Sequence, residues 1–153
     1  KKITVKNLSM TSVEISNHPV KDMGKRKIDV DGNFFISGED ANDIKEGMKI
    51  RLLGLGNISI TKIGAEFEGE FVEGEPKDIP KIQWVSQKTA HQIKMMIPKM
   101  LFNGEEFNED SLEELDVYTE PHYLQLKEGE EIQFVRFGYC RKDSQNQAIF
   151  THK

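Results

Sequence analysis

The segment "EIQFVRFGYCRKD", residues 131–143, decides how the β-structure of the chain is interpreted. It alternates like a β-strand, but its apolar residues change phase partway along: Ile132 and Phe134 come first, then Val135, Phe137 and Tyr139. In an unbroken strand successive side chains point to opposite faces, so Gln133 and Arg136 would diverge. One extra residue at 134–135 would reset the phase and keep all these apolar side chains inward. The pattern therefore predicts a β-bulge at 134–135 that turns Gln133 and Arg136 to one outward face, where they converge.

Outward from this segment, about eleven short runs alternate polar and apolar residues and are separated by turn residues. The dipeptide Asp31-Gly32 stands between two such runs and predicts a hairpin turn. The Gly-, Pro- and acid-rich stretch 69–80 is the best candidate for a linker or a long hairpin.

Helical signals are confined to two short segments. Ser37 is followed three residues later by Asp40, and Ser111 is followed three residues later by Glu114, both capping patterns. The sequence therefore indicates an all-β fold of closed or half-closed barrels, with one or two short helices as connectors.

Composition bounds the class of protein. The 153 residues suffice for one domain or two small ones sharing a core, and apolar content is 37%. No run approaches the roughly 18 apolar residues of a membrane span, and the N-terminus lacks the apolar region of a signal peptide. The single cysteine fits a reducing, cytoplasmic compartment. Because the chain does not begin with methionine, we expect a longer parent protein.

Charge is unevenly distributed along the chain, whose net charge is −5. Residues 105–116 and 66–75 are acidic, whereas residues 18–27, 81–101 and 138–142 are basic. One interpretation is a basic face that binds a phosphate backbone. The other is a mixed surface that is simply solvated.

No established catalytic or metal-binding pattern stands out in the sequence. The chain has no phosphate-binding glycine loop, and its four histidines lack ligand spacing. Arg141 and Lys142 follow Cys140 and could lower the pKa of its thiol, but a lone cysteine at a strand end is more typical of packing. The residues alone thus indicate a soluble β-barrel module that binds a polyanion, with no catalytic residue and no metal site.

Four stretches, taken in order, resemble the C-terminal anticodon-binding region of archaeal/eukaryotic-type glutamyl- and glutaminyl-tRNA synthetases, which are class I enzymes. These stretches are "NHPVKDMGKRKI" (17–28), "FFISGEDANDIKEGMKIRLLGLGNISITKI" (34–63), "KIQWVS" (81–86) and "IQFVRFGYCRKD" (132–143). The resemblance covers nearly the whole chain. It implies two small interleaved β-barrels of the ribosomal-protein-like type: a proximal barrel from about 1–75 and 140–153, and a distal barrel from about 76–139.

The resemblance also implies a function. The parent enzyme would be a glutamate–tRNA ligase that uses ATP and Mg²⁺ in a catalytic domain outside this chain, and the chain itself would be non-catalytic. Its partner would be tRNA-Glu, with tRNA-Gln as a further possibility, and we expect a monomer with no membrane association. The short acidic connection at 40–47 favours the glutamyl type, because glutaminyl enzymes carry a longer basic insertion there.

The family's functional residues carry over to matching positions. Gln133 and Arg136 match a glutamine and an arginine that read the middle anticodon base, a uridine. Arg51 matches an arginine near the 3′ side of the anticodon. Further contacts with the tRNA backbone or with stacked bases are expected from Lys25, Arg26, Tyr139 and Arg141. Trp84 and Phe137 are alternative stacking residues, although core packing is the more common role for such aromatics.

Three other functions stay open at this point. The chain could belong to a glutaminyl-type enzyme, it could be a ribosomal-protein-like barrel that binds structured rRNA, or it could be a protein-interaction barrel that uses its acidic loops.

Overall fold

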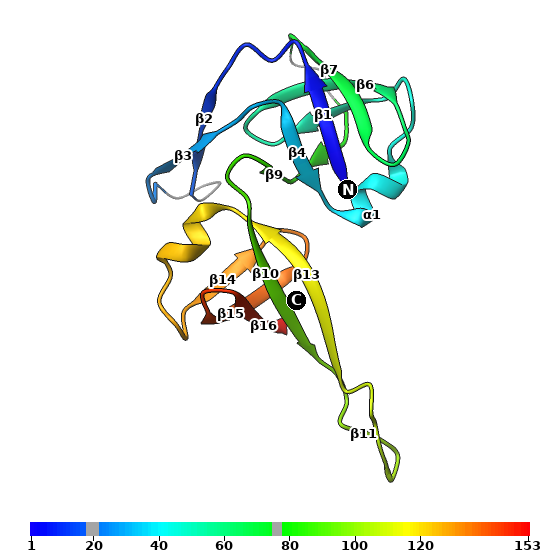
Figure 1. Ribbon diagram of the computed structural model, residues 1–153, viewed down its shortest axis with the longest axis vertical. Helices are drawn as coiled ribbons and strands as arrows, with labels where there is room; N and C mark the ends of the chain where they lie inside the picture. The colour runs from blue at the N-terminus through cyan, green and yellow to red at the C-terminus, as the bar shows by residue number, and fades with distance from the viewer. Residues whose placement is uncertain (18–21, 75–77) are drawn as a thin grey trace. The chain divides into compact units, whose positions relative to one another are not determined.

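The computed structural model describes residues 1–17, 22–74 and 78–153, which form two compact units, Lys1–Ala90 and His91–Lys153 (Figure 1). Each unit has a curled β-sheet around a hydrophobic core of its own. In the described residues, the helices are one six-residue α-helix and one five-residue 3₁₀-helix. The all-β prediction is therefore confirmed.

The boundary between the units falls at Ala90/His91, beyond the stretch 69–80 that the sequence marks as a linker. Residues 69–72 of that stretch belong to strand β7 (Phe67–Val72), the following strand β8 (Lys81–Ile82) is also in the first unit, and residues 75–77 lie outside the described residues. Which residues belong to the proximal barrel and which to the distal barrel stays a prediction.

The first unit contains a seven-stranded sheet in the order β8-β5-β6-β7-β1-β4-β9 and a separate two-stranded ribbon, β2–β3. Strands β1 and β7 are parallel, as are β5 and β8, and the other neighbours are antiparallel. The strands are β1 (Lys2–Lys6), β2 (Ser12–Ser16), β3 (Lys25–Asp29), β4 (Asn33–Ile36), β5 (Lys49–Leu52), β6 (Gly56–Lys62), β7 (Phe67–Val72), β8 (Lys81–Ile82) and β9 (Trp84–Ser86).

Alternation along the strands builds the core of this unit, as in β1, where Ile3 and Val5 are buried. Trp84 is 2% exposed. Its ring packs edge-on against Phe34 with centroids 4.9 Å apart, and its Nε1–H donates to the Leu53 carbonyl at 2.8 Å. Trp84 is therefore a core residue with a satisfied N–H, and it offers no exposed ring for a base.

Helix α1 (Gly38–Asp43) begins where the capping pattern predicts. The Asp40 N–H donates to Ser37 Oγ at 3.0 Å, and Ser37 Oγ donates to Asp40 Oδ2 at 2.9 Å. The side chain of Ser37 thus satisfies an N–H that the first turn of a helix leaves without an internal partner.

The hairpin predicted at Asp31-Gly32 is wrong. Strand β3 pairs with β2, and β4 pairs with β1 and β9, so the dipeptide links strands of different sheets. Gly32 has φ of 88°, and a Cβ on it would lie 2.7 Å from the Val5 carbonyl oxygen. The glycine instead permits close approach to β1, where the Val5 N–H donates to the Gly32 carbonyl at 2.7 Å.

The second unit is a five-stranded sheet in the order β13-β10-β16-β15-β14. Strands β10 and β16 are parallel and the other neighbours are antiparallel. A two-stranded ribbon, β11–β12, extends the β10–β13 hairpin (Figure 1). The elements are β10 (His91–Pro98), β11 (Phe102–Asn103), β12 (Glu106–Phe107), β13 (Leu112–Thr119), the 3₁₀-helix η1 (Pro121–Gln125), β14 (Glu131–Phe134), β15 (Gly138–Ser144) and β16 (Gln147–His152).

The short helix predicted from Ser111 and Glu114 is also wrong, because Leu112–Thr119 forms strand β13. This strand pairs with β10 from Leu112 opposite Pro98 to Thr119 opposite His91. A local capping pattern is worth about 1 kcal/mol, which a continuous cross-strand ladder outweighs. The second described helix is η1, which begins with Pro121 in the first helical turn.

Lys142, which the sequence places in a basic segment, is 3% exposed and lies inside the second unit. Its ammonium donates to three carbonyls at the end of η1, those of Tyr123 (3.2 Å), Leu124 (3.3 Å) and Leu126 (2.7 Å). It also lies 5.0 Å from the centroid of the Tyr123 ring. Carbonyl dipoles at a helix C-terminus and the face of an aromatic ring both attract a cation. Lys142 thus fastens η1 to the sheet and does not contribute to a basic surface.

Tyr123 also connects η1 to the sheet, through its hydroxyl group. Its side chain is 1% exposed, and its hydroxyl is 3.1 Å from the Ser144 carbonyl and 2.6 Å from the Gln147 carbonyl at the β15–β16 turn. Burial, with a smaller contribution from Asp143, raises the pKa of Tyr123 to about 12. The phenol therefore stays protonated and able to donate throughout the neutral range.

We predict that Lys142→Ala loosens η1. The substitution leaves three carbonyls without their charged donor, and such losses cost about 2–4 kcal/mol. Hydrogen exchange of the Tyr123 and Leu126 amides, which close η1, should accelerate accordingly. The exposed Lys127 provides the matched control, since Lys127→Ala should leave both amides protected. Unchanged exchange in Lys142→Ala would contradict the structural role.

Candidate nucleic-acid interface

The segment 131–143 forms a hairpin, so the bulge predicted at 134–135 is wrong. Strand β14 ends at Phe134, and β15 begins at Gly138, which pairs with Phe134. The Phe137 N–H donates to the Phe134 carbonyl at 3.0 Å and closes the turn of residues 135–137. The change of phase that suggested an extra residue is therefore the reversal of the chain.

The faces of the hairpin differ from the prediction in consequence. Ile132, Phe134 and Phe137 pack against the core, but Val135 is 53% exposed and Tyr139 is 36% exposed. These two residues were expected to point inward.

The turn presents Arg136 at its apex, in the left-handed region with φ of 69°. Arg136 is exposed, whereas Phe137 packs edge-on against Phe150 with ring centroids 5.6 Å apart. Gly138 has φ of 146°, and a Cβ on it would lie 2.6 Å from the Phe150 ring and 2.7 Å from the His152 carbonyl oxygen. The packing of Phe137 on Phe150 and the close approach at Gly138 thus hold the C-terminal side of the turn that carries Arg136.

Gln133 lies one step from this turn on β14. It is exposed and directly opposite Tyr139 on β15, so the two side chains share the outer face of the sheet. The structure therefore brings Gln133, Arg136 and Tyr139 into one hairpin. Arg141 follows on β15 as an exposed residue opposite Glu131.

A β-bulge is present one strand further along, on β16. Tyr139 pairs with His152 and Cys140 pairs with Phe150, so Thr151 is the extra residue. The shift turns His152 to the same outer face as Tyr139, and the two rings stack with centroids 4.7 Å apart at 13°. Sequence reasoning missed His152, because regular alternation through Ala148 and Phe150 would place it inward.

Cys140 is not a reactive thiol. It is buried between these outward positions, and burial raises its pKa to about 11. The effect of Arg141 and Lys142 suggested by the sequence does not operate, because Arg141 is exposed and Lys142 is bound to η1. Among the residues that the structure describes, no three His, Cys, Asp or Glu side chains gather in a way that could hold a metal ion.

The remaining predicted residues belong to the first unit. Arg51 on β5 is half-buried, and its Nη1 donates to Asn57 Oδ1 at 3.1 Å. Asn57 is 2% exposed and donates its Nδ2 to the Gly74 carbonyl, so Arg51 is oriented by a buried amide. In β3, Lys25 is exposed, whereas Arg26 is half-buried and donates to the Ser16 carbonyl at 3.0 Å.

Two lysines of the second unit, on or next to β10, are paired with acids of β13. Lys94 lies 3.4 Å from Glu114 and 3.7 Å from Asp116, and Lys99 lies 2.8 Å from Glu113. The Glu113 contact raises the pKa of Lys99 above its ordinary value. Residues 91–101 of the basic segment thus meet the acidic segment 105–116 on and next to the paired strands β10 and β13.

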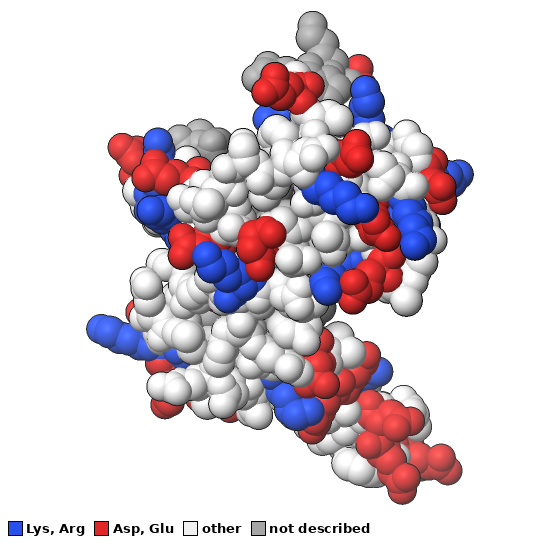
Figure 2. Space-filling view, turned by 45° about the horizontal axis from the view of Figure 1, so that its top comes forward, with Lys and Arg blue, Asp and Glu red and all other residues white. Residues whose placement is uncertain are grey.

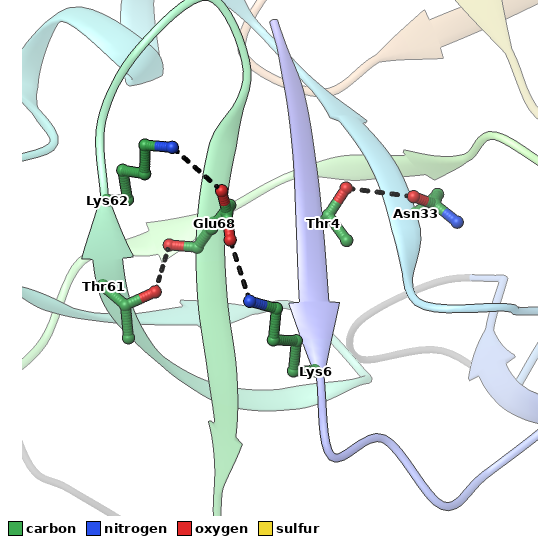
Figure 3. A network of polar contacts seen from close by, with 6 residues as sticks. All are labelled: Thr4, Lys6, Asn33, Thr61, Lys62 and Glu68. Carbon is green, nitrogen blue, oxygen red and sulfur yellow. Dashed lines mark hydrogen bonds and ion pairs between the residues drawn. The ribbon is translucent and has the colours of Figure 1, made fainter.

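On the outer face of the first unit, lysines are likewise paired with an acid. Glu68 on β7 accepts from Lys6 on β1 at 2.9 Å and from Lys62 on β6 at 3.4 Å, and its backbone carbonyl accepts from Thr61 Oγ1 at 3.2 Å (Figure 3). The two lysines lower the pKa of the Glu68 carboxyl. In Figure 3, Thr4 donates to Asn33 Oδ1 on the neighbouring strand at 3.0 Å. These side chains tie adjacent strands together.

Figure 2 shows basic and acidic side chains interspersed on the visible face, with acids gathered at the end of the β10–β13 hairpin. Such a distribution rules out a single broad basic face in this view. An RNA contact would therefore depend on local groups such as the exposed Arg136 and Arg141 of the β14–β15 hairpin.

Comparison with known families assigns the chain to a class of protein. The chain belongs to the family described as tRNA synthetases class I (E and Q), anti-codon binding domain. One model of that description matches residues 1–77 and a second matches residues 81–143, which include Gln133, Arg136 and Tyr139. The expected family is therefore confirmed.

Individual relatives are more specific. The chain is 73% identical over 154 residues to a glutamate–tRNA ligase of Nitrosopumilus maritimus, covering 100% of this chain and 27% of that protein. It is 44% identical over 153 residues to a glutamate–tRNA ligase of Cenarchaeum symbiosum, covering 99% of this chain and 27% of that protein. The bifunctional glutamate/proline–tRNA ligase of Mus musculus is 27% identical over 150 residues, which cover 82% of this chain and 10% of that protein. The chain thus spans about a quarter of the length of the first two relatives.

No helix in the described part of the chain is long and apolar enough to cross a membrane.

We predict that Arg136→Gly does not destabilise the turn. An L-residue in the left-handed region costs roughly 1–2 kcal/mol, and glycine avoids this cost at an entropic loss of about 0.5–1 kcal/mol. In urea unfolding, Arg136→Gly should be at least as stable as Arg136→Ala, which keeps the unfavourable φ.

Gly138→Ala is the matched change in the opposite direction, because its Cβ would collide with Phe150 and with the His152 carbonyl. It should be clearly less stable than the unaltered chain. An Arg136→Gly chain less stable than the Arg136→Ala chain would show that φ at this position carries no strain.

Proposed function

We propose that this chain is the anticodon-binding part of a cytoplasmic glutamate–tRNA ligase and that it binds tRNA-Glu through the β14–β15 hairpin. The observation that carries the proposal is the exposure of Gln133 and Arg136 on one hairpin within the residues matched to the anticodon-binding family. The glutamate–tRNA ligases of N. maritimus and C. symbiosum support the glutamyl type, since they align with 100% and 99% of the chain.

The parent protein would bind ATP and Mg²⁺ in a catalytic domain and attach glutamate to tRNA. In this division of labour, the 153-residue chain selects the tRNA and takes no part in the chemical step. Whether the parent also charges tRNA-Gln depends on how the remaining anticodon bases are read.

Gln133 and Arg136 would read the middle anticodon base. A base splayed out of a loop exposes its Watson–Crick edge, and that of uridine carries two carbonyl acceptors and one N–H donor. The guanidinium of Arg136 supplies only donors, whereas the amide of Gln133 supplies both a donor and an acceptor. The pair can therefore match uridine, and it mismatches cytidine, whose amino group replaces one carbonyl.

Arg141 would act differently, through the phosphate backbone. It is exposed on β15, and a cation that contacts phosphate carries no sequence information. Lys25 in the first unit is exposed in the same way and would make a similar contact. Arg51, whose guanidinium is oriented by Asn57, would contact the 3′ side of the anticodon.

The test compares the chain's affinity for tRNA-Glu carrying uridine or cytidine at the middle anticodon position. We expect the unaltered chain to prefer uridine and Arg136→Ala to lose that preference. Hydrogen-bonded base contacts of this type are worth about 1–3 kcal/mol of discrimination. Fluorescence anisotropy at one fixed salt concentration measures both affinities. Equal losses for the uridine and cytidine tRNAs in Arg136→Ala would contradict base reading.

Arg141→Ala is the matched control, because it removes a guanidinium from the same hairpin. It should weaken binding of both tRNAs alike and lower the slope of log affinity against log salt by about 1. A chain that binds tRNA-Glu no better than an unrelated tRNA would overturn the proposed function as a whole.

A further inference from the structure

We propose that the stacked rings of Tyr139 and His152 form a platform for an unpaired RNA base, with His152 as the residue that completes it. The inference rests on the proposed function and assigns a stacking site beside the hydrogen-bonding residues of the same hairpin. No comparison assigns a role to His152, which lies beyond residues 81–143, the range that the second family model matches.

The platform is a row of side chains across three strands. Gln133 on β14 pairs with Tyr139 on β15, and Tyr139 pairs with His152 on β16. All three residues are exposed. Directly opposite residues in an antiparallel sheet share a face, so the amide and the two rings lie side by side on the outside.

Core packing explains why a buried position carries an aromatic ring, but it does not explain the exposed rings of Tyr139 and His152. Trp84 and Phe137, the other two aromatic candidates, pack against Phe34 and Phe150 inside the protein. Tyr139 and His152 instead stack on each other with centroids 4.7 Å apart at an interplanar angle of 13°. A near-parallel pair leaves an outer π-face, the surface on which a base stacks.

Strand pairing keeps one side of the row open. Strand β10 pairs with β16 at Lys94–Gln147, Met95–Ala148 and Met96–Ile149, and this pairing ends three residues before His152. In the described part of the chain, no strand is paired to β16 at His152 on the side away from Tyr139. The His152 ring is therefore the edge member of the row.

Thr151, the bulged residue, fixes the orientation of the His152 ring. Its hydroxyl donates to the Tyr139 carbonyl at 2.9 Å and lies 3.1 Å from His152 Nδ1. A hydroxyl has one proton, so the contact with His152 requires Nδ1–H to donate to Thr151 Oγ1. In the neutral ring this leaves Nε2 as an acceptor. The bulge therefore sets both the direction and the tautomer of the ring.

Charge in the same hairpin favours a nucleic-acid occupant over an apolar one. Arg141 is exposed two residues after Tyr139 on β15, and Arg136 is exposed at the turn. Cations beside an aromatic surface suit a stacked base with its phosphate, and Gln133 can hydrogen-bond to a base edge.

The experiment measures binding of the chain to the tRNA-Glu anticodon stem–loop, with 2-aminopurine replacing one loop base at a time. Tyr139→Ala and His152→Ala should each lower affinity by about 5- to 150-fold, the range for loss of one stacked base. Tyr139→Phe and His152→Phe keep a ring and should bind almost as well as the unaltered chain. One loop position should show quenched 2-aminopurine fluorescence that the alanine variants relieve.

Two further readouts separate stacking from other roles. The slope of log affinity against log salt should be unchanged in His152→Ala, because no phosphate contact is lost, whereas Arg141→Ala should lower it. Thr151→Val removes the hydroxyl that orients the ring and should weaken loop binding less than His152→Ala does. Thermal unfolding of each variant, followed by circular dichroism, checks that the sheet is intact.

The outcomes are distinguishable. In the first outcome, the unaltered chain prefers the loop to a perfectly paired RNA duplex, but folded Tyr139→Ala and His152→Ala chains bind the loop as tightly as the unaltered chain does. The platform is then overturned and the proposed function stands. If the unaltered chain binds the duplex as tightly as the loop, the proposed function fails and the platform with it.

Discussion

The geometry of the candidate interface depends on the absence of a side chain at Gly138. Any Cβ there would lie within 2.7 Å of both the Phe150 ring and the His152 carbonyl oxygen. The start of β15 approaches the end of β16 this closely, Phe137 packs on Phe150, and Val135 and Arg136 in the turn before it are exposed. Arg136 then occupies the apex in a conformation that costs an L-residue free energy. The space available at Gly138 thus connects the Phe137–Phe150 contact with the position of Arg136 at the exposed turn.

Alternation in the sequence was sufficient to predict the all-β class and the inward residues of regular strands such as β1. It failed at 131–139 because a hairpin and a bulge give the same change of phase, and Arg136 is not a residue that marks a left-handed turn. Gly138 was the available signal for the turn. The errors at Asp31-Gly32 and Ser111–Glu114 have a common origin, since local turn and capping preferences are weaker than pairing with a distant strand.

Charge segregation in the sequence proved to be a poor guide to a binding face. The part of the basic segment 81–101 that forms β10 pairs with β13, which contains the end of the acidic segment 105–116, so Lys94 and Lys99 pair with acids of β13. The Lys142 ammonium is buried and donates to the carbonyls of η1. A run of like charges in this sequence can therefore belong to a strand that pairs with an oppositely charged strand, and it does not by itself identify a binding surface. The exposed Arg136 and Arg141 of the β14–β15 hairpin suit recognition of a few nucleotides better than attachment to a long duplex.

Strand β16 lies outside the residues that the family models match, yet it is central to the sheet of the second unit. The second family model ends at residue 143, yet β16 lies between β10 and β15, and the sheet would be split without it. Its Ala148 and Phe150 pack inward as any strand in that place requires, but the bulge at Thr151 alone brings His152 outward. Core packing therefore explains the inward residues of β16, but it does not explain the exposed ring of His152. The alignment with the N. maritimus enzyme covers 100% of the chain and so includes β16.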